Sequence, residues 1–344
     1  TNHKFFLNLA FQIAEKNLGQ TGQNPSVGSI VVKNNTVISS GVTSISGRPH
    51  AEYNALNKAK NTTGSTLYTS LEPCIHLGKT PPCTDIIIKK KIKSVYFGLE
   101  DPDLRTFQKA KKILKKKGIK TKLIKSKKYN NFYKSYLINK KYNKPFISAK
   151  IAISKDYYTI NKKKKWITNE LSRKRTHLLR SQYDSIISTS KSINNDNSLL
   201  NCRIDGFNKQ NPDLIIIDLR LRIRKDLDIF RLSVKRNIIL VTSNFNKKKV
   251  DFLKKKGVKI LFIDSLVDKK DLIFLFKKLK EIGYNRILIE TGLVFLNKVL
   301  KDKLIFNLFM FKTSRNLGKN GKNNISNIFL KKLKLTKKVN VNLN

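Results

Sequence analysis

Residues 50–57, HAEYNALN, and residues 66–83, TLYTSLEPCIHLGKTPPC, decide the fold of the N-terminal half. The first segment predicts a short helix over residues 50–60 that begins at His50, and TLYTSL predicts a strand. Residues 84–90 predict another helix, directly after Cys83. The two segments hold two of the three cysteines of the chain, Cys74 and Cys83, and an acid, Glu52, two residues after His50. Helix starts and the end of a strand can bring these side chains together although they are distant in sequence.

These residue types predict a catalytic zinc site. Zinc prefers histidine and cysteine ligands, and three protein ligands leave a fourth position for a water whose pKa the metal lowers. His50, Cys74 and Cys83 supply three ligands, and Glu52 is placed to transfer protons, as in zinc-dependent hydrolytic deaminases. A closed structural site is the alternative and would need a fourth ligand. His76 is the nearest candidate, since Cys202 lies far along the chain.

The sequence pattern on both sides of these segments predicts one α/β domain over residues 1–143. An amphipathic N-terminal helix precedes a hairpin whose β-branched runs are joined by Asn34 and Asn35. Further helices are expected over residues 104–117 and 130–140. The element order α-β-β-α-β-α-β-α-β predicts an α/β/α sandwich.

Residues 144–344 predict a second domain with a mostly parallel sheet covered on both faces, because apolar strands alternate with helices. Helices are expected from near Thr168, over 269–282 and over 293–300, with a polar loop over 191–211. Arg180 and Arg203 are candidate phosphate ligands, since a guanidinium matches a phosphate, although each taken singly also fits a surface arginine. The turn at Gly292, at a helix start, is a candidate anion site.

The charge balance is extreme, with 72 Lys and Arg against 23 Asp and Glu, a net charge of +49. The excess is mostly lysine spread over every helix and accompanied by Asn and Ile, which codon usage in an AT-rich genome produces. A basic nucleic-acid-binding or editing deaminase is the alternative, with Tyr133, Tyr136 and Tyr142 as stacking candidates. Three cysteines indicate a reducing, cytoplasmic location, and the sequence has no apolar run long enough to span a membrane.

Four segments of the first half resemble the deaminase half of the bifunctional riboflavin-biosynthesis deaminase/reductase family: NPSVG (24–28), GRPHAEYNAL (47–56), TLYTSLEPC (66–74) and HLGKTPPC (76–83). Eight residues separate Cys74 from Cys83, whereas nucleic-acid-editing deaminases typically have the pattern Pro-Cys-x-x-Cys, in which two residues separate the cysteines. The resemblance implies a cytidine-deaminase-like fold with zinc bound by His50, Cys74 and Cys83. It also implies Glu52 as proton carrier, and Asn24 and Lys79 as contacts for an aminopyrimidine ribose phosphate.

The second half resembles the reductase half of the same family, which is like dihydrofolate reductase in fold. The resemblance implies NADPH contacts at Ala152, Trp166, Thr168, Ser192, Asp196 and Gly292, and substrate contacts at Arg180, Leu200, Arg203 and Glu290. It implies a two-step enzyme that deaminates 2,5-diamino-6-ribosylamino-4-pyrimidinone 5′-phosphate with zinc and then reduces the ribosyl group to ribityl with NADPH. A homo-oligomer with a small-molecule substrate is expected, without membrane or nucleic acid as partner.

The sequence departs from the family pattern at several turns. After Asp101-Pro102 the usual glycine-rich turn reads DLRTFQKAKK, and the Ser-x-Asp-Gly turn ends in Tyr157 instead of glycine. The loop before Trp166 is wholly basic, Lys162 to Lys165, and Ser198 replaces a proline. A monofunctional deaminase with a degenerate reductase domain is therefore the second alternative.

Overall fold

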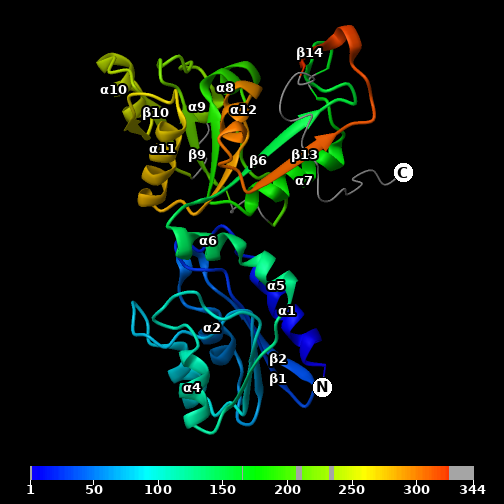
Figure 1. Cartoon of the computed structure of the whole chain (residues 1–344), viewed down its shortest axis with the longest axis vertical. Coiled ribbons are helices and arrows are strands. Elements are labelled where there is room, and N and C mark those ends of the chain that lie inside the picture. The colour runs from blue at the N-terminus through cyan, green and yellow to red at the C-terminus, as the bar shows by residue number, and fades with distance from the viewer. Residues whose placement is uncertain (1, 165, 207–210, 232–235, 325–344) are drawn as a thin grey trace. The chain divides into compact units, whose positions relative to one another are not determined.

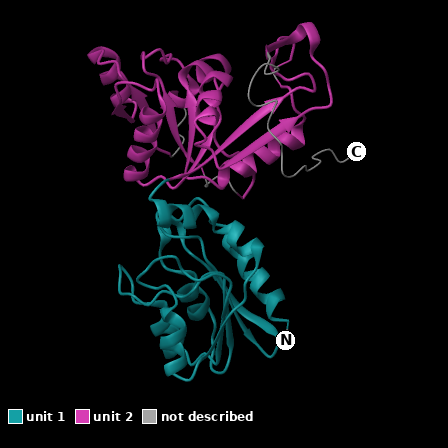
Figure 2. Ribbon diagram, in the orientation of Figure 1, with its two compact units in different colours: residues 1–144 teal, residues 145–344 magenta. Residues whose placement is uncertain are grey.

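The computed structural model describes residues 2–164, 166–206, 211–231 and 236–324. The chain divides into two compact units, residues 1–144 and residues 145–344, shown in different colours in Figure 2. The sequence placed this junction between residues 143 and 144. None of the helices in the described ranges has the length and apolar character needed to cross a membrane.

Unit 1 is a sheet between two layers of helices (Figure 1). In its described residues, five strands pair in the order β2-β1-β3-β4-β5. Strand β1 pairs with β2 and with β3, and both pairs are antiparallel. The pairs β3–β4 and β4–β5 are parallel. The strands are β1 (Gly28–Lys33), β2 (Thr36–Val42), β3 (Thr66–Thr69), β4 (Ser94–Phe97) and β5 (Lys120–Leu123).

The helices of unit 1 cover both faces of this sheet. One face packs against α1, α5 and α6, and the other against α2, α3 and α4. The expected α/β/α sandwich and its element order are confirmed. The helices are α1 (His3–Glu15), α2 (Ala51–Lys58), α3 (Cys83–Lys89), α4 (Lys109–Lys116), α5 (Lys127–Phe132) and α6 (Lys134–Tyr142), with the short 3-10 helix η1 (Ile45–Gly47).

The β1–β2 hairpin forms where the sequence predicted it. Asn34 and Asn35 have φ angles of 48° and 60°. Two successive positive φ angles are the signature of the type I′ turn, and asparagine tolerates this conformation better than most residues. The turn chemistry and the β-branched strands therefore agree.

The bounds expected for two helices of unit 1 were wrong. The helix expected over 104–117 begins only at Lys109, because residues 101–108 form a turn held by Glu72. Within that turn Gln108 adopts a φ of 58°, the left-handed conformation that glycine favours. The helix expected over 130–140 is two helices, α5 and α6, which meet at the buried Tyr133.

Unit 2 is built on a parallel sheet. In its described residues, seven strands lie in the order β11-β10-β9-β8-β12-β6-β13, and every neighbouring pair is parallel. The strands are β6 (Phe146–Ile153), β8 (Ser185–Thr189), β9 (Asp213–Ile217), β10 (Ile238–Thr242), β11 (Val258–Phe262), β12 (Arg286–Ile289) and β13 (Asn307–Lys312).

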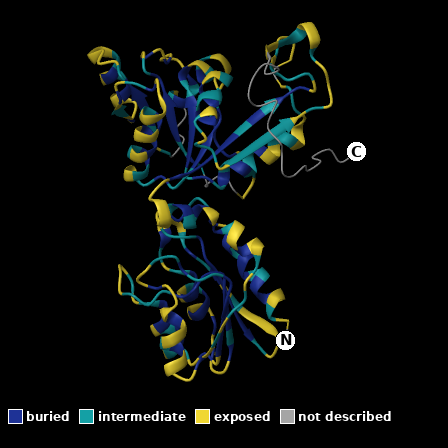
Figure 3. Ribbon diagram, viewed as in Figure 1, coloured by how far each residue is buried: buried dark blue, intermediate teal, exposed yellow. Residues whose placement is uncertain are grey.

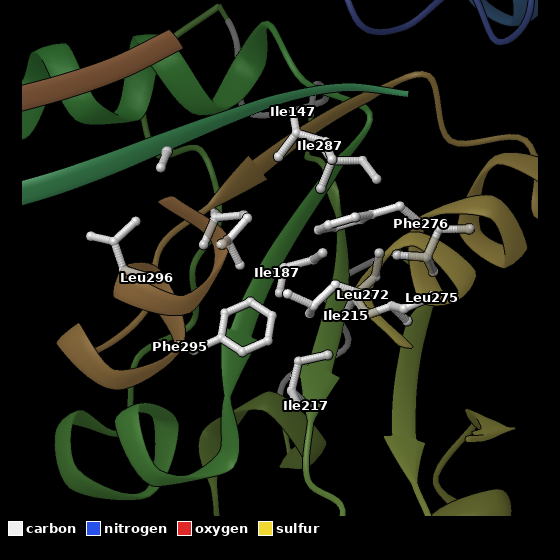
Figure 4. Packing of buried hydrophobic residues seen from close by; sticks show 14 of the residues in the cluster. Ile147, Ile187, Ile215, Ile217, Leu272, Leu275, Phe276, Ile287, Phe295 and Leu296 are labelled. Atoms are coloured by element: carbon white, nitrogen blue, oxygen red, sulfur yellow. The ribbon is translucent and has the colours of Figure 1, made fainter. Parts of the chain in front are cut away.

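Two hydrophobic clusters lie on the two faces of this sheet, as the continuous apolar runs predicted. Figure 4 shows one of them: isoleucines of neighbouring strands, such as Ile187 and Ile215, meet Leu272 of α11 and Phe295 of α12. The second cluster joins the sheet to α7, α8, α9 and α10. Figure 3 shows the central strands buried, β13 partly buried and the outer helix faces exposed. The helices are α7 (Glu170–Ser181), α8 (Ser190–Asp196), α9 (Asp228–Arg231), α10 (Lys247–Lys255), α11 (Lys269–Ile282) and α12 (Leu293–Lys301), with the 3-10 helix η2 (Gly318–Asn320).

Unit 2 also differs from expectation at two places. The loop expected over 191–211 contains most of α8, which begins at Ser190 because the Thr189 hydroxyl accepts from the Ser192 backbone N–H. A two-stranded antiparallel sheet, β7 (Tyr158–Asn161) with β14 (Gly321–Asn324), was not predicted. Before β7, Tyr157 has a φ of 68°, so the turn keeps a left-handed residue although its glycine is lost.

Candidate active sites

The three expected zinc ligands converge in unit 1. His50 is the N-cap of α2, Cys83 opens α3, and Cys74 lies in the loop that follows β3. The sulfur atoms of Cys74 and Cys83 lie 3.5 and 3.4 Å from His50 Nδ1. All three ligand atoms lie within 4.8 Å of one another.

This geometry fits a zinc ion. Zn–S distances of about 2.3 Å and Zn–N distances of about 2.0 Å give a tetrahedron whose S···N edges are roughly 3.5 Å, close to the separations observed. Hydrogen bonds from Cys83 and His50 hold the pKa of Cys74 well below its usual range, which favours the thiolate that binds metal. In the described residues no other His, Cys, Asp or Glu joins the group. His76 instead pairs with the Thr106 hydroxyl, at 3.3 Å. A fourth position is therefore open, as a catalytic site requires.

Glu52 lies beside the cluster in the first turn of α2, with 3% of its surface exposed. Its Oε1 accepts from the Thr69 hydroxyl and its Oε2 from the Cys83 thiol, both at 3.4 Å. Burial raises the pKa of Glu52 to about 6. A carboxyl group whose pKa is near neutrality both accepts and releases protons at physiological pH, as a general acid–base requires.

The expected substrate contacts of unit 1 lie on two loops. Asn24 donates from Nδ2 to the Gly47 carbonyl, at 2.9 Å, and thereby holds the loop that precedes His50. Lys79 is exposed in the loop between the two cysteines. Sequence reasoning missed Arg48, whose guanidinium donates to the Thr80 hydroxyl in that same loop. The available signal was an arginine two residues before a zinc ligand, in a domain whose other basic residues are almost all lysines.

In unit 2 a buried ion pair brings Arg180 and Glu290 together. Arg180 Nε and Nη2 donate to the two Glu290 oxygens at 2.7 and 3.0 Å. Lys150 Nζ lies 3.8 Å from Glu290, and the charges of Arg180 and Lys150 outweigh burial and lower the pKa of Glu290. Glu290 is therefore ionised and in contact with two cations.

The loop after α8 completes this cluster. Arg180 Nη1 donates to the Asn201 carbonyl, and Arg203 Nη1 donates to Asn201 Oδ1 at 2.9 Å. Leu200 in the same loop has a φ of 49°. Arg180, Leu200, Arg203 and Glu290 were expected from the sequence, whereas Lys150 and His177, whose Nδ1 accepts from the Arg203 backbone N–H, were not. Lys150 has a visible signal, because it is a charged residue within the apolar strand β6.

Four of the six expected cofactor contacts lie at or after the carboxyl ends of neighbouring strands in the middle of the sheet. Ser192, Gly292 and Ala152 lie at the carboxyl ends of β8, β12 and β6, three neighbouring strands where ligands of such sheets bind. Gly292, the N-cap of α12, donates its N–H to Ser192 Oγ at 3.1 Å. Asp196 ends α8, so it belongs to the same connection as Ser192.

Trp166 and Thr168 are joined through Arg173 of α7. The Arg173 guanidinium lies 5.3 Å from the Trp166 ring centre and donates to the Thr168 carbonyl. Trp166 is 53% exposed. A half-exposed aromatic ring, a hydroxyl and a helix N-terminus are groups that suit a dinucleotide phosphate and its rings, so these residues fit NADPH. In the basic loop before Trp166, Lys163 and Lys164 donate their backbone N–H groups to Asn161, and Lys165 lies outside the described residues.

Comparison with known proteins covers both units. Residues 145–342 match the family model of the RibD C-terminal domain, and residues 1–99 match that of the cytidine and deoxycytidylate deaminase zinc-binding region. The riboflavin biosynthesis protein RibD of Aquifex aeolicus is 31% identical over 322 residues, covering 92% of this chain and 88% of that protein. The RibD of Buchnera aphidicola is 32% identical over 331 residues, covering 91% and 87%.

Solved structures agree with these matches. Acinetobacter baumannii RibD, form 1, has a TM-score of 0.78 at 26% identity and covers 93% of this chain and 89% of its own. A diaminohydroxyphosphoribosylaminopyrimidine deaminase/5-amino-6-(5-phosphoribosylamino)uracil reductase from Thermotoga maritima has a TM-score of 0.80 at 26% identity, covering 95% and 90%.

Proposed function

The chain belongs to the RibD family of riboflavin-biosynthesis proteins, and on this premise we propose that residues 1–143 form its deaminase domain and residues 144–344 its reductase domain. It is a bifunctional enzyme, a zinc-dependent deaminase and an NADPH-dependent reductase. Its substrate is a small pyrimidine phosphate. The deaminase acts on 2,5-diamino-6-ribosylamino-4-pyrimidinone 5′-phosphate, and the reductase then acts on the deaminated product.

The deamination replaces an exocyclic amino group of the pyrimidine by oxygen from water and releases ammonia. His50, Cys74 and Cys83 would hold the zinc, which when bound would act as a Lewis acid and lower the pKa of water. Glu52 takes a proton from the attacking water and delivers protons to the ring nitrogen and to the leaving amine. Asn24 and Lys79 hold the pyrimidine edge and the phosphate, because an amide can pair with the ring and an ammonium with the phosphate.

The reduction converts the ribosyl group to ribityl, and NADPH supplies the hydride. The residues of unit 2 bind and orient the two molecules. Ser192, Asp196, Gly292, Ala152, Thr168 and Trp166 contact the cofactor. Arg180, Leu200, Arg203 and Glu290 contact the substrate, and the pairing of Arg180 with Glu290 fixes both side chains before the substrate arrives.

The observation that carries the proposal is the buried Glu52 beside three converging zinc ligands. The test incubates the zinc-loaded protein with the diaminopyrimidine ribosylamine phosphate and NADPH and follows ammonia release and NADPH oxidation. We expect Glu52→Gln to slow ammonia release by about 10²- to 10⁴-fold, the usual contribution of general acid–base catalysis, while reduction of already deaminated substrate continues. Normal ammonia release by Glu52→Gln would contradict the assigned role.

Neither alternative function is favoured. The second half matches the reductase family model over residues 145–342, which speaks against a chain with deaminase activity alone. The aromatic residues suggested for nucleic-acid stacking do not form an exposed face: Tyr133 is 2% exposed, and the Tyr136 hydroxyl donates to Asp101 within unit 1. Only Tyr142 of these three is largely exposed.

The proposal also includes the oligomeric state of the protein and its location in the cell. The family resemblance supports a homo-oligomer, which light scattering of the purified protein tests. Cys74, Cys83 and Cys202 are free thiols, which suits a reducing cytoplasm.

A further inference from the structure

Arg48 connects the two segments that build the deaminase site. It lies two residues before the zinc ligand His50, on the loop held by Asn24. Its Nη1 donates a hydrogen bond to the hydroxyl of Thr80, in the loop between Cys74 and Cys83. The guanidinium thus contacts the loop that carries Lys79, a residue that the proposed function assigns to the substrate.

Gly78 allows this close approach. A Cβ atom at residue 78 would lie only 3.1 Å from Arg48 Nη2, tighter than nearly all contacts of real Cβ atoms. The guanidinium therefore lies directly against the backbone of the loop. A Cβ atom at this position would require the guanidinium to shift by a few tenths of an ångström.

Arg48 has no acidic partner among the residues that the structure describes. The other arginine of unit 1, Arg105, forms a two-pronged pair with Asp103. A guanidinium has five N–H donors, and Thr80 takes only one of those of Arg48. The remaining donors of Arg48 lie beside a loop that also carries Lys79, directly before Thr80 in the chain.

We propose that Arg48 binds the 5′-phosphate of the pyrimidine substrate in the deaminase site, together with Lys79. The guanidinium fork matches two phosphate oxygens, and a charge-assisted pair of this kind is among the strongest hydrogen-bonding contacts. Arg48 thereby sets the preference of the first step for phosphorylated over unphosphorylated substrate. The inference rests on the proposed deaminase function.

The test compares two substrates, the diaminopyrimidine ribosylamine 5′-phosphate and the same compound without phosphate. Arg48→Gln is expected to lower kcat/KM for the phosphorylated substrate by about tenfold or more, mainly through KM, because a charged hydrogen-bonded contact is lost. For the unphosphorylated substrate, Arg48→Gln should have the same kcat/KM as the unmodified protein. Arg48→Lys should recover part of the loss, since it keeps the charge without the fork. Lys111→Gln, which removes one exposed charge on α4, is the matched control. It should change kcat/KM for neither substrate.

Inorganic phosphate gives a second measurement that does not depend on the phosphorylated substrate. It should inhibit deamination of the unphosphorylated compound by the unmodified protein and inhibit Arg48→Gln several-fold less. Zinc content and reductase activity show that each variant is folded.

Two results would overturn the inference. An equal loss on both substrates would mean that Arg48 only supports the loop, and no loss on either would mean that the phosphate lies elsewhere. Absence of ammonia release by the unmodified protein from both substrates is a different outcome, because it refutes the deaminase function itself and the role of Arg48 with it.

Discussion

At the scale of single residues, His177 lies within the cationic cluster of the reductase site. Its Nδ1 lies 2.9 Å from the Asn201 carbonyl oxygen and 3.3 Å from the backbone nitrogen of Arg203. Burial and the nearby charge of Arg180 lower the pKa of His177 to about 4. A neutral imidazole here avoids adding a further charge beside Arg180 and Arg203.

This environment predicts an acid-sensitive stability of unit 2. The pKa of an unfolded histidine is about 6.5, so below that pH the unfolded chain takes up the proton first and the free energy of unfolding falls until about pH 4. Because His177 is only half buried, solvent screening limits the effect to about 1 kcal/mol. His177→Asn keeps a donor for the Asn201 carbonyl but cannot titrate.

Urea unfolding at pH 7 and pH 5 checks this prediction. The stability difference between the two pH values should be about 1 kcal/mol smaller in His177→Asn than in the unmodified protein. Acid effects of other groups, including Glu290, are common to both proteins and cancel. An identical pH dependence would show that His177 titrates normally in the folded protein.

The residues of the zinc site could be predicted from sequence, whereas several of their neighbours could not. The His-x-Glu and Pro-Cys spacing specifies ligand chemistry locally, and the structure brings His50, Cys74 and Cys83 together. Arg48 and Lys150 acquire their roles from contacts with residues 32 and 140 positions away. No local pattern encodes such partners.

At the scale of elements, one buried carboxylate shapes the turn that leads into α4. Glu72 accepts the backbone N–H groups of Asp101, Gln108 and Ala110, at 3.1 to 3.2 Å. The first N–H groups of a helix have no partner within the helix, and here a side chain from the loop after β3 supplies an acceptor. This arrangement holds residues 101–108 against the deaminase site without the glycines of the family pattern.

Glu72→Ala is expected to destabilise unit 1 by about 2–3 kcal/mol, because three backbone donors lose their acceptor and only part of the loss is recovered by water. Glu100→Ala is the control. Glu100 accepts only from the exposed Gln108 side chain, so its loss should stay within about 0.5 kcal/mol. Chemical unfolding of the zinc-loaded proteins measures both, and equal effects of the two substitutions would contradict the role of Glu72.

The same contacts explain which elements the sequence predicted. The strands of the five- and seven-stranded sheets, α2, α3 and α11 were placed to within a few residues, because their apolar spacing and end residues are local signals. The start of α4 was misplaced since Glu72, 36 residues earlier, decides it. The pairing of β7 with β14 joins residues about 160 positions apart, and neither strand has enough apolar residues to be recognised alone.

At the scale of the whole molecule, the net charge of +49 has a consequence for an enzyme whose substrate and cofactor are both phosphorylated. A strongly positive field raises the rate at which anionic ligands reach the protein, and the effect falls with ionic strength. The charge needs no nucleic-acid partner to be useful, even where codon usage is its origin.

Each unit has hydrophobic clusters of its own, two in unit 1 and two in unit 2 among the described residues. The proposed zinc ligands all belong to unit 1 and the proposed NADPH contacts all to unit 2. A ligand that binds only the folded state stabilises the unit that binds it. We therefore expect thermal unfolding in two transitions that respond to different ligands.

Calorimetry of the full chain with and without each ligand checks this expectation. Removing zinc with a chelator should lower the Tm of one transition and abolish ammonia release, while reduction of deaminated substrate continues. NADPH at 100 times its Kd should stabilise the other transition by about 2.7 kcal/mol. If either ligand moved both transitions together, the two units would unfold as one cooperative body. Binding at one site would then stabilise the other unit as well, although the two sites share no residue.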